Sequence, residues 1–278
     1  MSSVVSMEWV KENLGKADVA VADCRFALGH GESGRQAYRE GHLPGAVYFH
    51  LEEDLSAPIG EHGGRHPLPD TGELSRKLGE AGIGPGTTVI AYDDQGGAMA
   101  SRFWWLLRYL GHEQVYLMDG GYSAWKAEGY PVTQEVPQPE GRAFIPHVHN
   151  EMVVGVEEVK AGLGRPDRVL IDSREARRYQ GLEEAIDPVA GHIPGAVNRF
   201  WKDALDENGR WKDAEAMKER FRDLPSDKEI VVYCGSGVTA CPNILALQQA
   251  GFPKVKLYAG SWSDWVSYPD NPVATGEE

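Results

Sequence analysis

The chain repeats itself once, and this duplication constrains the fold more than any other feature of the sequence. Residues 41–47 read GHLPGAV, and residues 191–197 read GHIPGAV. Three more pairs of similar blocks keep their order in both halves: residues 19–25 with 169–174, residues 88–92 with 229–233, and residues 117–125 with 257–265. A period of roughly 140 to 150 residues is too long for a solenoid unit and is typical of a duplicated domain. We therefore predict two domains, residues 1–133 and 151–278, joined by a linker at residues 134–150, where Pro and Gly interrupt apolar periodicity.

Short strands rich in β-branched residues alternate with helical patterns within each half. In the second half, residues 169–172 and 230–233 are typical of buried strands, and residues 242–250 of a helix closed by Gly251. This alternation predicts an α/β fold in which each domain is a parallel sheet flanked by helices on both faces. Ligands of such sheets bind beyond the carboxyl ends of the strands. The chemistry is therefore expected where the strands end.

Composition limits the kinds of binding partner and the cellular compartment that fit this chain. Among 278 residues, 28 are Lys or Arg and 42 are Asp or Glu, which gives a net charge of −14 and argues against nucleic acid or a membrane surface as a partner. The most apolar helical stretch, residues 103–110, is far shorter than the roughly 20 residues of a membrane span, and no signal peptide is evident. Three cysteines, Cys24, Cys234 and Cys241, do not make a disulfide framework. These features predict a cytoplasmic protein with free thiols.

The two halves differ in chemistry at the end of one matching strand. There the first half continues with Asp93, whereas the second continues with Cys234 in the sequence CGSGVTA, residues 234–240. Two glycines, Gly235 and Gly237, allow this loop to turn its backbone N–H groups inward, and the positive end of the following helix adds to them. Such an environment stabilises negative charge on sulfur. Cys234 is therefore predicted to be a reactive thiolate, whereas Cys24 and Cys241 are interpreted as packing residues.

Two alternative kinds of cysteine site compete with this interpretation of the loop. A cysteine phosphatase places an Arg after five intervening residues, to hold phosphoryl oxygens. Ala240 occupies that position here, which argues against a phosphatase. No Cys-x-x-Cys spacing occurs, and the nine histidines show no paired ligand motif, so no metal site is predicted.

At this point the sequence resembles the two-domain rhodanese family of sulfurtransferases. Residues 38–49 and 255–265 resemble the two family signatures, although Asp264 stands where the family usually has Glu, and residues 234–240 resemble the active-site loop of mercaptopyruvate-type members. The resemblance implies two tandem rhodanese-like domains, with an inactive N-terminal copy and a catalytic C-terminal copy. The contrast between Asp93 and Cys234 points the same way independently.

The resemblance also implies the reaction. A small anionic donor, thiosulfate or 3-mercaptopyruvate, would pass its sulfane sulfur to Cys234, and the Cys234 persulfide would pass it to a thiol or to cyanide without a metal or organic cofactor. Gly235 and Ser236 replace two cations of thiosulfate-type loops, which favours mercaptopyruvate, whereas Gln180 replaces an Arg of the mercaptopyruvate type. The choice of donor therefore stays open. A non-catalytic rhodanese-like binding module is the alternative function.

Site residues follow from the loop and from the resemblance. The backbone of Gly235, Gly237 and Val238 is expected to surround the sulfur and substrate. Arg174 is expected to hold the anionic end of the donor, and its alternative role is a structural ion pair with Asp172.

Polar side chains are expected to assist the transfer. Ser236 and Thr239 could orient groups or relay protons, although Thr239 could instead cap the following helix. His66 resembles a histidine of the mercaptopyruvate branch and, with Glu52 and Ser236, could form a proton relay. The alternative for His66 and Glu52 is an exposed loop position. His42, in the repeated turn, is interpreted as structural together with its counterpart His192.

Overall fold

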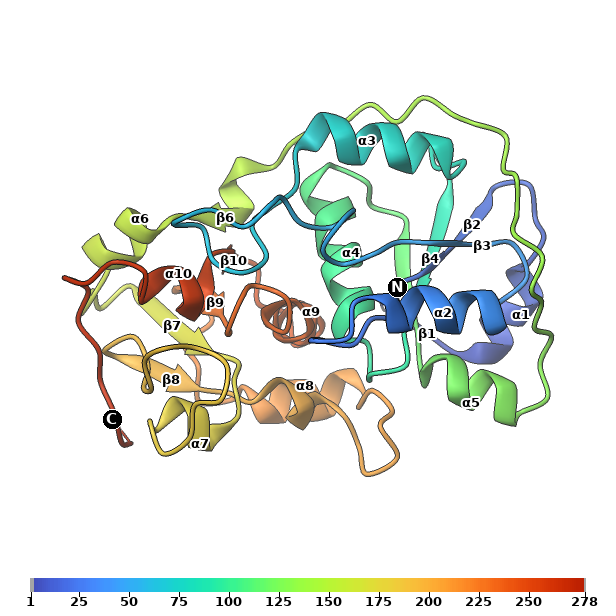
Figure 1. Cartoon of the computed structure of the whole chain (residues 1–278). Helices are drawn as coiled ribbons and strands as arrows, with labels where there is room; N and C mark the ends of the chain where they lie inside the picture. The colour runs from blue at the N-terminus through green and yellow to red at the C-terminus, as the bar shows by residue number, and fades with distance from the viewer. Residues whose placement is uncertain (1–2, 278) are drawn as a thin grey trace. The chain divides into compact units, whose positions relative to one another are not determined.

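The chain folds into two compact units, shown for residues 3–277 in the computed structural model (Figure 1). The first unit runs to Ala57, resumes over Leu68–His149 and includes Glu207–Trp211. The second unit comprises Pro58–Pro67, Asn150–Asp206 and the chain from Lys212 onward. Each unit therefore contains one short segment that comes from the opposite half of the sequence.

The first unit is built on one parallel sheet of five strands. The strands are β1 (Val4–Val5), β2 (Val19–Asp23), β3 (Ala46–Tyr48), β4 (Thr88–Tyr92) and β5 (Val115–Met118), in the order β1-β5-β4-β2-β3. The flanking helices are α1 (Met7–Asn13), α2 (Glu32–Glu40), α3 (Thr71–Glu80), α4 (Ala98–Tyr109) and α5 (Gly121–Ala127). The predicted linker is largely part of this unit, because Arg142 donates to Thr87 Oγ1 and the N–H of His147 to the carbonyl of Leu110.

The second unit repeats this arrangement strand for strand. Its strands are β6 (Val153–Val154), β7 (Arg168–Asp172), β8 (Ala196–Asn198), β9 (Glu229–Tyr233) and β10 (Val255–Tyr258), all parallel and ordered β6-β10-β9-β7-β8. The helices are α6 (Val156–Ala161), α7 (Ala176–Tyr179), α8 (Ala214–Arg220), α9 (Ala240–Gln249) and α10 (Ser261–Trp265), with short 3-10 turns η1 (Asn150–Met152) and η2 (Trp201–Ala204). The predicted α/β fold with duplicated parallel sheets is confirmed.

The central strand of the second sheet explains where its site forms. Ile230, Val231, Val232 and Tyr233 of β9 are fully buried, as expected for a parallel strand covered on both faces. Neighbouring strands end at the same edge, since Tyr233 pairs in register with Asp172 of β7. The residues that follow β7, β9 and β10 therefore converge beyond this edge.

The two histidines of the repeated turns lie in equivalent structural positions. Nδ1 of His42 is 2.7 Å from the carbonyl oxygen of Tyr38, and Nδ1 of His192 is 2.8 Å from that of Tyr179. Each imidazole also stacks on the ring of that tyrosine. Because both units use the same contacts, the structural interpretation of these histidines is confirmed. No helix among residues 3–277 is long and apolar enough to cross a membrane.

Candidate active site

Cys234 is the first residue after β9, and the residues from it to Thr239, here called the cysteine loop, lead into α9. The start of α10 holds this loop. The N–H of Cys234 donates to Ser261 Oγ (3.1 Å), and the carbonyl of Cys234 accepts from the N–H of Trp262 (3.0 Å). Ser261 takes a left-handed backbone conformation, with φ of 57°, to present its hydroxyl. The last block of the repeat thus anchors the loop rather than contacting the sulfur.

The sulfur of Cys234 is buried against the backbone of its own loop. The N–H of Gly237 points at Cys234 Sγ over 3.1 Å. Gly237 has φ of 79°, and a Cβ atom at this position would lie 2.2 Å from the carbonyl oxygen of Ala259. Glycine is therefore required here both for its backbone conformation and for the close approach of the chain.

The matching loop of the first unit shows what such a loop binds. Oδ1 of Asp93 accepts from the N–H groups of Gln95 and Gly97, and Oδ2 accepts from those of Met99 and Ala100, all at 2.8 to 2.9 Å. Burial raises the pKa of Asp93, and these four donors oppose the shift. In the first unit the protein's own Asp93 carboxylate therefore occupies these backbone N–H groups.

The side chains of His66 and Ser236 are in contact, whereas their part in a proton relay stays a prediction. Nδ1 of His66 lies 2.7 Å from Ser236 Oγ, and both side chains are buried. His66 reaches this position because Pro58–Pro67 belongs to the second unit, and Figure 1 shows that segment, in light blue, beside α10. Glu52 is an exposed residue of the first unit, and its part in a relay stays a prediction.

The remaining loop residues have simpler positions. Val238 is buried, and Thr239 is half-buried at the residue before α9. The Thr239 side chain makes no capping hydrogen bond, so the expectation that it caps the helix is wrong. Its φ and ψ of −76° and 2° differ from the extended backbone that capping requires.

Arg174 lies in a buried ion pair. Its Nη2 is 2.6 Å from Oδ2 of Asp172, and the same nitrogen donates to the carbonyl oxygen of Gly191 (2.6 Å). In the first unit, Arg25 makes the same pair with Asp23, also at 2.6 Å. Because this arrangement recurs in the copy without a thiol, the geometry favours the structural alternative for Arg174 over donor binding.

Two other arginines, which sequence reasoning missed, lie against the cysteine loop. A Cβ atom on Gly235 would be 3.0 Å from Nη2 of Arg65 and 3.6 Å from Nη1 of Arg178. Burial lowers the pKa of Arg65, and negative charge on Cys234 acts in the opposite direction. The sequence did offer a local signal for each arginine. Arg65 directly precedes His66, and Arg178 begins the short stretch that contains Gln180.

Gln180 itself does not contribute to the loop. Its Nε2 donates to Oε1 of Glu277 over 2.9 Å at an exposed position. This contact of the side chain is therefore with the C-terminal segment and not with the cysteine loop. Cys24 and Cys241 are both buried, and burial raises the pKa of the Cys24 thiol, which matches their interpretation as packing residues.

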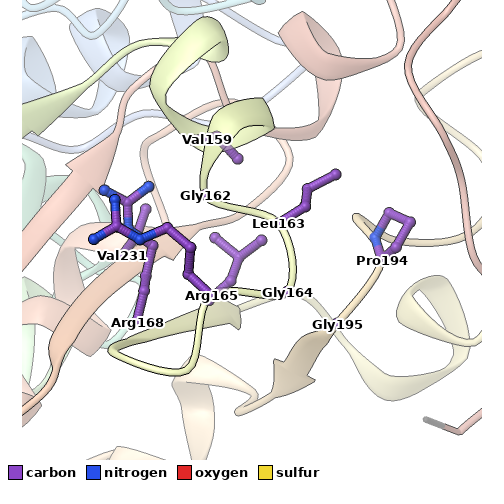
Figure 2. A pocket seen from close by; sticks show the side chains of 10 residues that line it. Val159, Gly162, Leu163, Gly164, Arg165, Arg168, Pro194, Gly195 and Val231 are labelled. Atoms are coloured by element: carbon purple, nitrogen blue, oxygen red, sulfur yellow. The ribbon is translucent and has the colours of Figure 1, made fainter.

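A separate cavity of about 160 Å³ lies near the amino ends of β7 and β8 (Figure 2). Its walls combine apolar and small residues with two arginines: Val159, Gly162, Leu163, Gly164, Arg165, Arg168, Leu170, Pro194, Gly195 and Val231. Arg165 is paired with Asp167, and Arg168 with Glu158 and Glu229. The cavity holds no residue of the cysteine loop.

One group of possible metal ligands occurs among the described residues, in the first unit. It consists of Glu32, His50 and Glu53. Both ring nitrogens of His50 are already engaged, since Nδ1 accepts the N–H of Glu53 and Nε2 lies 3.2 Å from the carbonyl oxygen of Gly31. These contacts do not favour metal binding by the histidine.

Two parallel α/β units that repeat one topology, with Cys234 in the second where the first has Asp93, define a duplicated-domain protein, and comparison with known proteins gives its family. The rhodanese-like domain model matches residues 6–128 and 155–268. The chain belongs to the rhodanese-like domain family, as predicted.

Individual relatives cover nearly the whole chain. The "probable 3-mercaptopyruvate sulfurtransferase" of Pseudomonas aeruginosa is 44% identical over 99% of this chain and 99% of its own. A thiosulfate sulfurtransferase of Gallus gallus is 34% identical over 95% and 93%. The crystal structure of SseA from Escherichia coli, described with the 3-mercaptopyruvate sulfotransferases, superposes with a TM-score of 0.81 at 32% identity and covers 95% of this chain and all of that one.

Proposed function

We propose that this protein is a sulfurtransferase that moves sulfane sulfur from a small anionic donor to a thiophilic acceptor through a persulfide on Cys234. The observation that carries the proposal is the position of Cys234 Sγ, at the tip of β9 with the N–H of Gly237 pointing at it. The equivalent loop of the first unit, together with the first turn of α4, binds the Asp93 carboxylate through four N–H groups, which supports an anion-stabilising role for the cysteine loop. The relatives named as sulfurtransferases support the same reaction.

In the first step the Cys234 thiolate attacks the outer sulfur of thiosulfate or the thiol sulfur of 3-mercaptopyruvate, here called the outer sulfur in both donors. A bond forms between the two sulfurs, and the bond from the outer sulfur to the rest of the donor breaks with its electron pair leaving on that remainder. Thiosulfate releases sulfite, and 3-mercaptopyruvate releases the pyruvate carbanion, which takes up a proton. In the second step a thiolate or cyanide attacks the terminal sulfur, and Cys234 returns to its thiolate form.

The chain's own groups have separate tasks in these steps. Loop N–H groups stabilise the negative sulfur, in the way that an oxyanion hole stabilises oxygen. Arg65 and Arg178 bind the anionic end of the donor, in place of Arg174, because they are the guanidinium groups next to Gly235. Ser236 supplies the proton to the carbanion and takes one in turn from the protonated imidazole of His66, which regains it from solvent. Three free cysteines fit a cytoplasmic location, which is part of this proposal.

The direct test is to mix the purified protein with thiosulfate or 3-mercaptopyruvate and to follow thiocyanate formed from cyanide. Without acceptor, intact-mass analysis should show a species heavier by about 32 Da, with the added sulfur on Cys234. Absence of both thiocyanate and the heavier species with either donor contradicts the proposed function and favours the non-catalytic binding module.

Replacing His66 with Gln should affect the two donors differently. Sulfite leaves without needing a proton, whereas the pyruvate carbanion must be protonated. We therefore expect turnover of 3-mercaptopyruvate to fall about a hundredfold, within the usual range for loss of general acid catalysis, while thiosulfate turnover stays within about twofold. Steady-state kcat for both donors measures this.

His62→Gln is the matched control for that measurement. His62 lies in the same segment and also contacts a serine, since its Nδ1 is 2.8 Å from Ser267 Oγ, but this pair is exposed. The control variant should behave as the unmodified protein. An equal loss with both donors in the His66 variant would contradict the relay and assign His66 a purely structural role.

A further inference from the structure

Two buried carboxylates hold the arginines that face the cysteine loop. Asp187 bridges them, because its Oδ1 pairs with Nη1 of Arg65 and its Oδ2 lies 3.0 Å from Nη2 of Arg178. Glu184 makes a bidentate contact with Arg178, because its carboxylate accepts from Nη2 at 2.7 Å and from Nε at 3.1 Å. The side chains of Asp187 and Glu184 are only 2% and 4% exposed, so these pairs are poorly screened by water.

The carboxylates use a particular subset of the arginine nitrogens. They bind Nη1 of Arg65 and Nε and Nη2 of Arg178. A Cβ atom on Gly235 would lie nearest to Nη2 of Arg65 (3.0 Å) and Nη1 of Arg178 (3.6 Å), with the carboxylate-bound Nη2 of Arg178 next at 3.8 Å. Asp187 therefore fixes both guanidinium groups so that each presents a different nitrogen to the loop.

The same contacts cancel the charge of the donor pocket. Arg65 and Arg178 contribute two positive charges, and Asp187 and Glu184 contribute two negative ones. Arg174 belongs to the same cluster, because its Nη1 lies 3.4 Å from Oε2 of Glu184, and Asp172 supplies the third negative charge that balances it. The site thus offers directed hydrogen-bond donors with little net positive field, and a second negative charge on a donor gains little there.

We propose that Asp187 is a specificity-determining residue that positions Arg65 and Arg178 and suppresses the preference of the site for dianionic donors. The inference rests on the proposed sulfur transfer at Cys234. Its consequence is a site that discriminates between donors by their charge: thiosulfate carries two charges at neutral pH, whereas the carboxylate of 3-mercaptopyruvate carries one. Removing the charge of Asp187 should favour the dianion selectively.

Asp187→Asn tests this role, because it removes one charge and keeps the shape of the side chain. The measurement is kcat/KM for both donors with cyanide as the acceptor. We expect the ratio of thiosulfate to 3-mercaptopyruvate to rise about tenfold, since one uncompensated positive charge a few ångströms away attracts the second donor charge. The gain should shrink as ionic strength rises. Glu184→Gln should shift the ratio in the same direction.

Glu183→Gln is the matched control, because it changes the net charge equally at an exposed residue paired with Arg177. The donor ratio of this control should not change. An unchanged ratio in both Asp187→Asn and Glu184→Gln overturns the proposal. An equal loss with both donors also overturns it, because a merely structural role predicts that result.

A second readout separates this inference from the proposed function. Alkylation of Cys234 by iodoacetamide is followed with sulfate or acetate as a protecting anion, which needs no turnover. Sulfate should protect the Asp187→Asn variant at about tenfold lower concentration than the unmodified protein, with acetate changed much less. Equal protection in the two proteins overturns the role of Asp187, whereas failure of the unmodified protein to form a persulfide contradicts the proposed function instead.

Discussion

Replacing Cys234 with serine is expected to abolish sulfur transfer from both donors. A serine hydroxyl is not ionised at neutral pH and cannot form a persulfide, so the covalent intermediate is lost. We expect a fall of at least about a thousandfold in thiocyanate formation, as is usual when a covalent nucleophile is removed. Intact-mass analysis should show no gain of sulfur after incubation with either donor.

Cys241→Ser is the matched control, because Cys241 is a buried cysteine on α9 whose Sγ lies 3.4 Å from the carbonyl oxygen of Gly237. It changes the same atom within the same region and should keep most of the activity. Persistent transfer by the Cys234 variant, with normal folding shown by circular dichroism, would remove Cys234 from the reaction and with it the persulfide mechanism.

Replacing Gly237 with alanine is expected to have the second largest effect. The new Cβ would be forced to within 2.2 Å of the carbonyl oxygen of Ala259, so the loop backbone must move. The N–H that points at Cys234 Sγ moves with it. A displacement of about 1 Å at a reacting group can slow a reaction about a hundredfold, and we expect a loss of that size in kcat with either donor.

Gly195→Ala isolates the part of this effect that comes from backbone strain. Gly195 has φ of 77°, close to the 79° of Gly237, but a Cβ atom added to Gly195 would meet no other atom within 4 Å. This variant should lose about 1 kcal/mol of unfolding free energy and keep its activity. If the two variants lose activity equally, the close approach to Ala259 is not the reason that Gly237 is needed.

The phosphatase alternative conflicts with the geometry of the loop as well as with its sequence. Ala240, at the position of the phosphate-binding Arg, is the first residue of α9 and is fully buried. The arginines near the loop, Arg65 and Arg178, come from elsewhere and are held by carboxylates. The loop therefore lacks the arginine that holds phosphoryl oxygens from within a phosphatase loop, and hydrolysis of p-nitrophenyl phosphate is not expected.

The sequence by itself determined the duplication and the α/β class, and it predicted which cysteine is reactive. These properties depend on local patterns: apolar strands of fixed length, turn residues that recur in order, and a thiol in one copy where the other has Asp93. Such patterns are readable because each strand and turn is specified by neighbouring residues, and because the first half serves as an internal comparison for the second.

Only the tertiary structure showed which cations lie beside the cysteine loop. Arg174 follows a strand end and was the natural choice from sequence, but its guanidinium turns back to Asp172 and the carbonyl oxygen of Gly191. Arg65 arrives from 122 residues away to pair with Asp187. A long, flexible side chain binds whichever partner the fold brings within reach, and that choice depends on pairings between distant segments that no local pattern encodes.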